Sequence, residues 1–281
     1  MKVRLCLLQL RSIPGRKEIN IAKAIEVIKS DKVEEEVDLN IYILPELYVQ
    51  GYLSKDLHFI LAETIPGPTT ELFAEVLKEK SVKSIAILGM SERSSEDRLL
   101  YNSAAIVGER GVIGVYRKRH LPSYGLFEEL RYFNPWRGTI NVYNIDGLKL
   151  GVAICYDAFF PEVSRTLMLR GAILHVYLSA APDMSRDHFE TFIKCRAMEN
   201  TVFVAYVNNV GFQDGIGFFG GSHVRGPLGK MLVKAKLYEE DVVSAVIDTD
   251  RIRSAREKRP IIRDLIFQDV KDLYDAYLAR S

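Results

Sequence analysis

Short apolar runs alternate with segments of helical spacing along most of the chain. The first run, Val3–Leu10, has the length and composition of a β-strand. Behind it, Ile21, Ala24 and Ile28 recur at the three- and four-residue spacing of one helix face. Further strands are predicted at Asn40–Leu44, Ile85–Leu88, Ser103–Val107, Val112–Tyr116, Leu148–Ile154, Ala172–Leu178, Thr201–Val207 and Val242–Ile247.

Helices are predicted between these runs where capping residues precede an apolar periodicity. Ser and Thr side chains accept hydrogen bonds at a helix start, proline suits the first turn, and glycine suits the end. On these signals we expect a helix beginning at Thr69 or Thr70, one from Pro161 to Gly171, one from Ser185 to Glu199, and one over Leu265–Leu278.

Each half of the chain opens strand–helix–strand and then adds further strands. This order indicates an α/β protein, and the two halves could stack sheet on sheet with helices outside. No Pro/Ser-rich or low-complexity linker divides the 281 residues, so we expect one domain over residues 1–281. A chain of this length buries about three quarters of its unfolded surface and needs no disulfide or metal to fold.

Composition and charge exclude several classes of protein. The 38 Lys and Arg residues nearly balance 37 Asp and Glu, which offers no electrostatic footprint for nucleic acid. Three widely spaced cysteines, Cys6, Cys155 and Cys195, form no disulfide framework and favour a reducing, cytoplasmic compartment. No stretch approaches the ~18 apolar residues of a membrane span. No histidine or cysteine pair has metal-ligand spacing, and no cofactor is expected.

Three reactive side chains follow directly on predicted strands. Glu46 comes after Asn40–Leu44, Lys118 after Val112–Tyr116, and Cys155 after Leu148–Ile154. Ligands of α/β sheets bind beyond the carboxyl ends of strands, so these side chains could converge on one pocket. A thiol needs a base or a positive field to attack a carbonyl carbon, and the carboxylate and ammonium would supply both.

Each of the three residues alone has an ordinary structural interpretation. Cys155 could be a small buried apolar residue, Glu46 a loop residue, and Lys118 part of a solvated run of basic residues. Their coincidence at three strand ends is what favours a catalytic site.

Five blocks of sequence strengthen this interpretation. The blocks are Leu44–Leu47 with Gly51–Tyr52, Tyr116–Pro122, Gly151–Asp157 with Pro161–Glu162, Arg196–Asn200, and Gly220–Ser222 ahead of Gly226–Gly229. In order and spacing they resemble the signature of the nitrilase superfamily, whose members are carbon–nitrogen hydrolases with a Glu–Lys–Cys triad. The resemblance extends from about Val3 to Asp248.

The resemblance implies a fold, an assembly and roles for individual residues. The fold is a four-layer α–β–β–α sandwich, and the chain is expected to form a homodimer with the tail 249–281 at a subunit interface. Cys155 is the implied nucleophile, Glu46 the general base and Lys118 the oxyanion partner, with the backbone N–H of Tyr156 completing the oxyanion site.

The family also has a second glutamate after the lysine. The spacing to Tyr132–Phe133 favours Glu129, and Glu128 stays an alternative. Arg131 is a candidate to bind a substrate carboxylate, although it could equally brace its own loop.

Other signals receive structural interpretations. Asp157, Arg196 and Glu199 are expected to hold the turn and the long helix, and Cys195 is expected to pack within that helix. Gly215–Gly220 matches G-x-G-x-x-G, but no strand leads into it and no helix follows it, so we expect a glycine-rich loop feeding a strand. The basic segment Arg251–Arg259 is expected to be a solvated or subunit-bridging tail.

The sequence thus predicts an amidase that converts a small primary amide to a carboxylic acid and ammonia through a cysteine acyl-thioester. Tyr124–Glu129 and Val210–Asp214 also resemble the glutaminase part of glutamine-dependent NAD synthetases. A glutaminase serving a separate synthetase is therefore an alternative. A nitrile substrate, and a non-catalytic binding protein on the same fold, are further alternatives.

Overall fold

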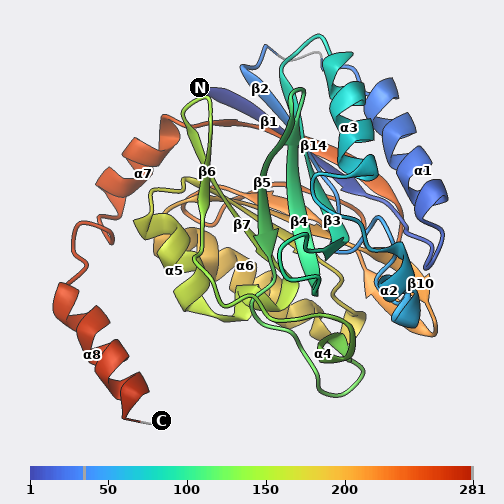
Figure 1. Cartoon of the computed structure of the whole chain (residues 1–281). Coiled ribbons are helices and arrows are strands. Elements are labelled where there is room, and N and C mark those ends of the chain that lie inside the picture. Colours follow the sequence, from blue (N-terminus) through green and yellow to red (C-terminus); the bar gives the residue numbers. More distant parts are fainter. Residues whose placement is uncertain (34–35, 280–281) are drawn as a thin grey trace.

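Two six-stranded sheets packed face to face form the centre of the computed structural model (Figure 1), which describes residues 1–33 and 36–279. The first sheet has the order β14-β1-β2-β3-β4-β5, and the second has the order β13-β12-β9-β8-β7-β6. The strands of the first sheet are β1 (Lys2–Gln9), β2 (Leu39–Ile43), β3 (Ser84–Arg93), β4 (Leu100–Gly108), β5 (Gly111–Arg117) and β14 (Asp241–Asp248). Those of the second are β6 (Val142–Ile145), β7 (Leu148–Ile154), β8 (Leu174–Ser179), β9 (Phe203–Asn208), β12 (His223–Arg225) and β13 (Met231–Lys234).

Helices cover the outer face of each sheet. Helices α1 (Lys17–Ser30) and α3 (Pro68–Lys78) lie on the first sheet, and α5 (Pro161–Leu169) and α6 (Arg186–Asn200) lie on the second (Figure 1). The expected four-layer α–β–β–α sandwich is confirmed. The remaining helices are α2 (His58–Leu61), α4 (Glu129–Tyr132), α7 (Arg251–Lys258) and α8 (Phe267–Leu278), and a hairpin of β10 (Val210–Gln213) and β11 (Ile216–Phe219) lies beside the sheets.

Strand periodicity distributes the apolar residues between two cores. In β1, Leu5 and Leu7 point into the core between the sheets, whereas Cys6 and Leu8 point into the core beneath α1 and α3. The side chains of successive strand residues point to opposite faces, so one continuous apolar run serves both layers. This is why the central strands are apolar throughout rather than alternating with polar residues.

Strand direction gathers three strand ends at one edge of the sandwich. Strand β2 is parallel to β3, and β3, β4 and β5 are antiparallel in turn, so β2 and β5 run the same way. Strand β7 of the second sheet is parallel to β8. The segments that follow β2, β5 and β7 carry Glu46, Lys118 and Cys155.

Several predicted element ends differ from the structure. The start of α3 is not capped by Thr69 or Thr70: Gly67 precedes the helix, and the Thr70 hydroxyl accepts a hydrogen bond from the Gly67 N–H at 2.9 Å. Strand β9 begins at Phe203 rather than Thr201, because Thr201 ends α6 with a φ of 44° in the left-handed region.

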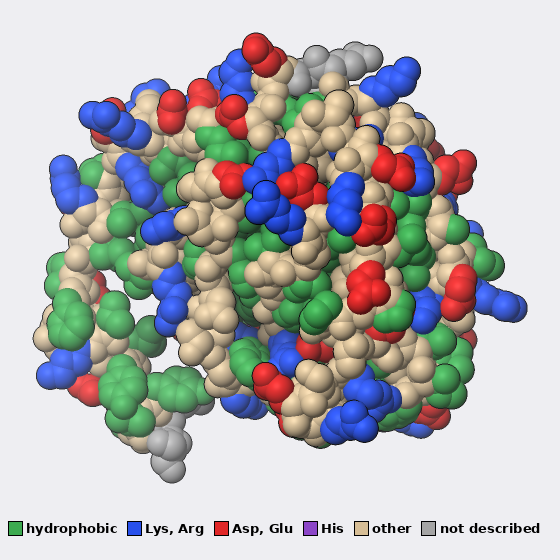
Figure 2. Space-filling model, turned by 45° about the horizontal axis from the view of Figure 1, so that its top comes forward, with side chains coloured by type: hydrophobic (Ala, Val, Ile, Leu, Met, Phe, Trp, Pro, Cys, Tyr) green, Lys and Arg blue, Asp and Glu red, His purple; other side chains and the backbone are tan. Residues whose placement is uncertain are grey.

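The basic segment after β14, predicted to be a solvated or subunit-bridging tail, forms helix α7, with Ile252 and Ala255 buried against the body. Beyond it, α8 confirms the predicted last helix but stands away from the sandwich, and none of its residues is buried (Figures 1 and 2). Among the helices of the described residues, none has the length and apolar character required to cross a bilayer.

A glycine in β3 lets the chain after β2 lie directly against the first sheet. A Cβ atom on Gly89 would overlap the Pro45 carbonyl oxygen and would lie 2.7 Å from the Leu47 nitrogen and 2.8 Å from the Glu46 Cα. The backbone that carries Glu46 is therefore positioned by the missing side chain of Gly89.

We expect Gly89→Ala to destabilise the fold by about 1–3 kcal/mol, the usual effect of overpacking, and to displace Glu46. Thermal unfolding and circular dichroism would measure the loss. Gly226→Ala is the matched control, because a Cβ there would meet no atom closer than 3.8 Å. Equal stability of the two variants would contradict the close packing at Gly89.

Candidate active site

A buried ammonium lies between two buried carboxylates at the shared strand edge. The Lys118 Nζ atom donates to Glu46 Oε1 at 2.6 Å and to Glu129 Oε1 at 2.7 Å. The side chains of Glu46 and Lys118 have no exposed surface, and that of Glu129 is 4% exposed. Burying charges is costly unless they are paired and hydrogen-bonded, so such a cluster is rarely retained without a use.

Two further residues complete this cluster, and sequence reasoning did not assign them a role. Asn102, in β4, donates from Nδ2 to Glu46 Oε1 at 2.7 Å and to Glu129 Oε2 at 3.4 Å. The Tyr52 hydroxyl donates to Glu129 Oε1 at 2.7 Å. The second Glu46 oxygen accepts from the Ala180 N–H at 2.7 Å. Asn102 reaches both glutamates because β4 lies between the strands that lead to Glu46 and Lys118, an order that only the folded sheet shows.

The structure separates the two candidates for the second glutamate. Glu129 is buried and bonded to Lys118, whereas Glu128 is exposed and its nearest polar contact is the Tyr132 hydroxyl at 3.5 Å. The residue expected from spacing, Glu129, is therefore the one that joins the cluster.

Cys155 occupies the turn between β7 and a short 3-10 helix, Cys155–Phe159. Its φ is 47°, a left-handed conformation that a residue with a Cβ rarely adopts and that costs about 1–3 kcal/mol. Ile154 pairs with Leu178 of β8, which places Cys155 beside Ser179, the residue before Ala180. Cys155 is 5% exposed.

Asp157 stabilises this strained turn. Its buried carboxylate accepts hydrogen bonds from the Tyr116 hydroxyl at 2.8 Å, from the His120 N–H at 3.0 Å and from the Ile154 N–H at 3.3 Å. These contacts tie the end of β7 to the strand and loop around Lys118.

The long helix α6 is tied to the same turn. Arg196 donates from Nε to the Ala158 carbonyl at 2.9 Å and from Nη1 to Glu199 at 2.7 Å. Asp157, Arg196 and Glu199 thus make the contacts that a structural role requires.

Electrostatics keep the lysine charged and the thiol neutral. Burial disfavours the Lys118 ammonium, but the charges of Glu129 and Glu46 outweigh it and raise the pKa of Lys118 above its usual value. Burial, reinforced by Glu46, also raises the pKa of the Cys155 thiol well above its usual range. A thiol in this state needs a base to remove its proton during attack.

A pocket of about 210 Å³ leads to the cluster from outside. Three segments form it: the chain after β2, the loop with α4, and the β10–β11 hairpin. This volume is smaller than the 300–1,000 Å³ of pockets for drug-sized ligands, so a bound molecule must be small. The lining residues are Leu47, Tyr52, Leu53, Lys55, Leu126, Glu128, Glu129, Tyr132, Phe133, Asp214 and Ile216.

Two residue assignments from the sequence need correction. Arg131 does not line this pocket: it pairs with Asp56 at 3.1 Å and lies over the Tyr132 ring, so it braces its loop. Cys195 is exposed on α6 rather than packed within it.

The glycine-rich motif is a hairpin. Asp214 and Gly215 form its two-residue turn with φ values of 45° and 81°, and β11 follows. Within the described residues, no group of three or more His, Cys, Asp or Glu side chains is placed to hold a metal ion.

A comparison against known families identifies the family of this chain. The carbon-nitrogen hydrolase family model matches residues 4–257. The chain belongs to the carbon-nitrogen hydrolase family. This family membership, within the nitrilase superfamily, confirms the resemblance inferred from the five blocks.

Individual carbon-nitrogen hydrolases resemble most of the chain. A nitrilase of Pyrococcus abyssi is 34% identical over 260 residues, covering 91% of this chain and 92% of that protein. A glutamine-dependent NAD(+) synthetase of Aquifex aeolicus is 34% identical over 261 residues, covering 92% of this chain but only 44% of the synthetase. A solved carbon-nitrogen hydrolase from Helicobacter pylori superposes with a TM-score of 0.86 at 26% identity, covering 98% of this chain and 99% of that one.

The cluster generates a prediction about pH. Burial, and then the Glu46 charge, raise the pKa of Glu129 from 4.5 to about 7, against the opposing effect of Lys118. Between these two pH values the unfolded chain has lost a proton that the folded chain keeps. The contribution of Glu129 to stability therefore falls as pH rises through this window and is constant outside it.

Chemical denaturation from pH 4 to 8 should show this trend as a stability difference between the wild type and Glu129→Gln. We expect the wild type to lose stability relative to this variant as pH rises. Glu128→Gln, which changes the exposed neighbouring carboxylate, is the control and should show a much weaker trend. A difference for Glu129→Gln that does not change with pH would contradict the prediction.

Proposed function

We propose that this carbon-nitrogen hydrolase is an amidase that converts a small primary amide to a carboxylic acid and ammonia. The observation that carries the proposal is the buried Glu46–Lys118–Glu129 cluster beside Cys155, which combines a base, a cation and a nucleophile. A small pocket reaches this cluster at Glu129. Primary amides suit the site because their leaving group, ammonia, is small enough to leave through that pocket.

In the first half of the reaction, Glu46 takes the proton of the Cys155 thiol as sulfur attacks the amide carbon. The C–S bond forms and the carbonyl electrons move to oxygen. A lysine ammonium has three N–H donors, and Lys118 gives two to carboxylates, which leaves one for this oxyanion. The backbone N–H of Tyr156 is the proposed second donor. Glu46 then protonates the nitrogen, the C–N bond breaks, and ammonia leaves an acyl-thioester on Cys155.

In the second half, Glu46 takes a proton from water, whose oxygen attacks the thioester carbon. Lys118 again holds the oxyanion. The C–S bond breaks, the thiolate regains the proton from Glu46, and the carboxylic acid leaves. One water is consumed, and both Cys155 and Glu46 return to their starting states.

Glu129 is the positioning residue of the site. It accepts from Lys118 and from Tyr52, and thereby fixes the ammonium between the two carboxylates. Because Asn102 donates to both glutamates, the spacing of Glu46 and Glu129 is held as well.

A glutaminase is the second candidate function. It is supported by the match to the Aquifex aeolicus synthetase, of which this chain spans less than half. In that case the ammonia released would serve a synthetase.

Cys155→Ala should abolish ammonia release while the protein stays folded, because the thiol is the proposed nucleophile. Cys195→Ala is the matched control and should keep full activity, since Cys195 is exposed on α6. Mass spectrometry of acid-quenched wild type should find the acyl group of the amide on the peptide containing Cys155. An active Cys155→Ala protein, or an acyl group on another residue, would overturn the proposal.

We also propose that the chain forms a homodimer in which α8 packs on a second copy. Helix α8 has an apolar stripe at helical spacing that is wholly exposed (Figure 2), whereas its opposite face is acidic. The stripe consists of Phe267, Val270, Leu273, Tyr274, Tyr277 and Leu278, and the acidic face carries Asp269, Asp272 and Asp275.

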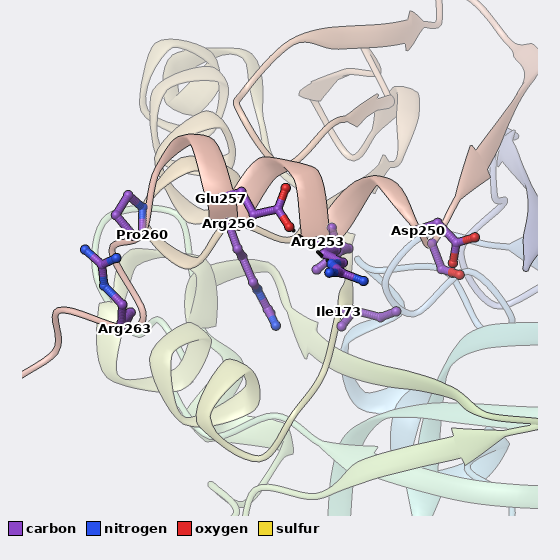
Figure 3. A pocket seen from close by; sticks show the side chains of 9 residues that line it. Ile173, Asp250, Arg253, Arg256, Glu257, Pro260 and Arg263 are labelled. Carbon is purple, nitrogen blue, oxygen red and sulfur yellow. Dashed lines mark hydrogen bonds and ion pairs between the residues drawn. The ribbon is translucent and has the colours of Figure 1, made fainter.

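A basic cleft beside α7 offers a complementary surface. It measures about 700 Å³, and its charged lining consists of Arg253, Arg256 and Arg263 against Asp250 and Glu257. Arg256 extends from α7 into the cleft (Figure 3). Arg253 pairs with Glu257 and Arg263 pairs with Asp264, so Arg256 is the cation best placed to meet an acidic helix of the second copy.

Light scattering after size exclusion should give a dimer at micromolar concentration. The double variant Val270→Glu and Tyr274→Glu should shift the protein towards monomer, because it places charges in the apolar stripe. Gln268→Glu, on the face opposite to the stripe, is the control and should stay dimeric. A monomeric wild type, or a dimer that the double variant leaves intact, would contradict the assembly.

A further inference from the structure

The pocket described above changes from buried to exposed along its length, with polar groups at both ends and apolar walls between them. Its inner end is Glu129, which is bonded to Lys118. Leucine, isoleucine and aromatic side chains form the walls. Its outer rim carries three charged side chains, Lys55, Glu128 and Asp214. An amide held at the inner end would therefore present its far end to these three charges.

Two of the rim charges neutralise each other. Lys55 Nζ lies 2.5 Å from Asp214 Oδ2, and both side chains are more than half exposed. The pair joins the chain after β2 to the tip of the β10–β11 hairpin. Arg131, the other cation nearby, is paired with Asp56 and does not line the pocket.

Glu128 leaves the rim with a net negative charge. Among the described residues, no ion pair is recorded for it, and its polar contact is the Tyr132 hydroxyl at 3.5 Å, the limit of a hydrogen bond. The rim therefore holds one ammonium and two carboxylates, and the uncompensated charge is a carboxylate.

We propose that Glu128, assisted by Asp214, selects amides that carry a primary ammonium at the end opposite to the amide. The inference rests on the proposed amidase function and adds its substrate class. The ammonium of such a substrate meets Glu128 without breaking the Lys55–Asp214 pair. A carboxylate at the same end has to displace Asp214 from Lys55 and then lies close to Glu128. In a substrate that carries both an ammonium and a carboxylate, the carboxylate contacts Lys55 and the ammonium contacts Glu128 and Asp214.

Four amides that differ only at the far end test this inference. Glutamine has both charged groups, 4-aminobutanamide has the ammonium alone, glutaramate has the carboxylate alone, and butanamide has neither. We expect kcat/KM, measured by ammonia release, to be higher for 4-aminobutanamide and glutamine than for butanamide, and lowest for glutaramate. Exposed ion pairs are weak, so a preference of about five-fold over butanamide is expected.

Two variants and one control locate the preference. Glu128→Gln should bring the ratio of kcat/KM for 4-aminobutanamide to that for butanamide close to one, mainly through KM. Asp214→Asn frees Lys55 and should raise kcat/KM for glutaramate relative to that for butanamide. Asparagine suits the left-handed backbone conformation of this turn position. Glu71→Gln, an exposed change on α3 away from the pocket, should leave all ratios unchanged.

The possible outcomes separate this inference from the proposed function. The inference is overturned if glutaramate is the best substrate, if the four amides react equally, or if Glu128→Gln keeps the preference for an ammonium. The proposed function survives these results as long as ammonia is released and Cys155 is acylated. If no amide acylates Cys155, the proposed function fails and the inference fails with it.

Discussion

A buried ammonium can exist in this fold only because buried carboxylates surround it, and groups from both sheets hold those carboxylates in place. Lys118 has no exposed side-chain surface, and an unpaired charge there would cost several kcal/mol. Glu46 and Glu129 compensate it, but two carboxylates beside one lysine leave a net negative charge. Asn102, Tyr52 and the Ala180 N–H donate to these carboxylates and make the cluster tolerable. Because these groups come from both sheets, the two sheets must pack in one register.

The same burial also sets the protonation of Glu129 and Cys155. Both carboxylates face Lys118, and burial raises the pKa of Glu129 to about 7. Cys155 stays a neutral thiol for the same reason. The proposed nucleophile is thus protonated at rest, beside the carboxylate proposed as its base. The strained turn at Cys155, held by Asp157, places its sulfur at the end of β7 rather than within the strand.

The sequence predicted the fold and the central cluster well because both depend on strong local signals. Apolar runs identified the main strands, and the strand ends identified Glu46, Lys118 and Cys155. What failed depends on tertiary contacts. Gly67 replaces Thr69 or Thr70 before α3 because Thr70 bonds back to the Gly67 backbone, and α7 is helical because Ile252 and Ala255 find a buried surface. The part played by Asn102 required knowing that β4 lies between β3 and β5, which no local pattern reveals.

The outer pocket shows the same division between local and tertiary information. Arg131 was a reasonable partner for a substrate carboxylate in the sequence, since it is two residues from Glu129. In the folded chain Asp56 neutralises it, and the cation at the pocket rim is Lys55, from a segment more than 70 residues away. Lys55 is in turn neutralised by Asp214, so among the described residues that line the pocket the carboxylate without an ion pair is that of Glu128. The sign of the charge that the pocket rim presents is thus set by which ion pairs form in the fold, and not by the number of basic residues near the site.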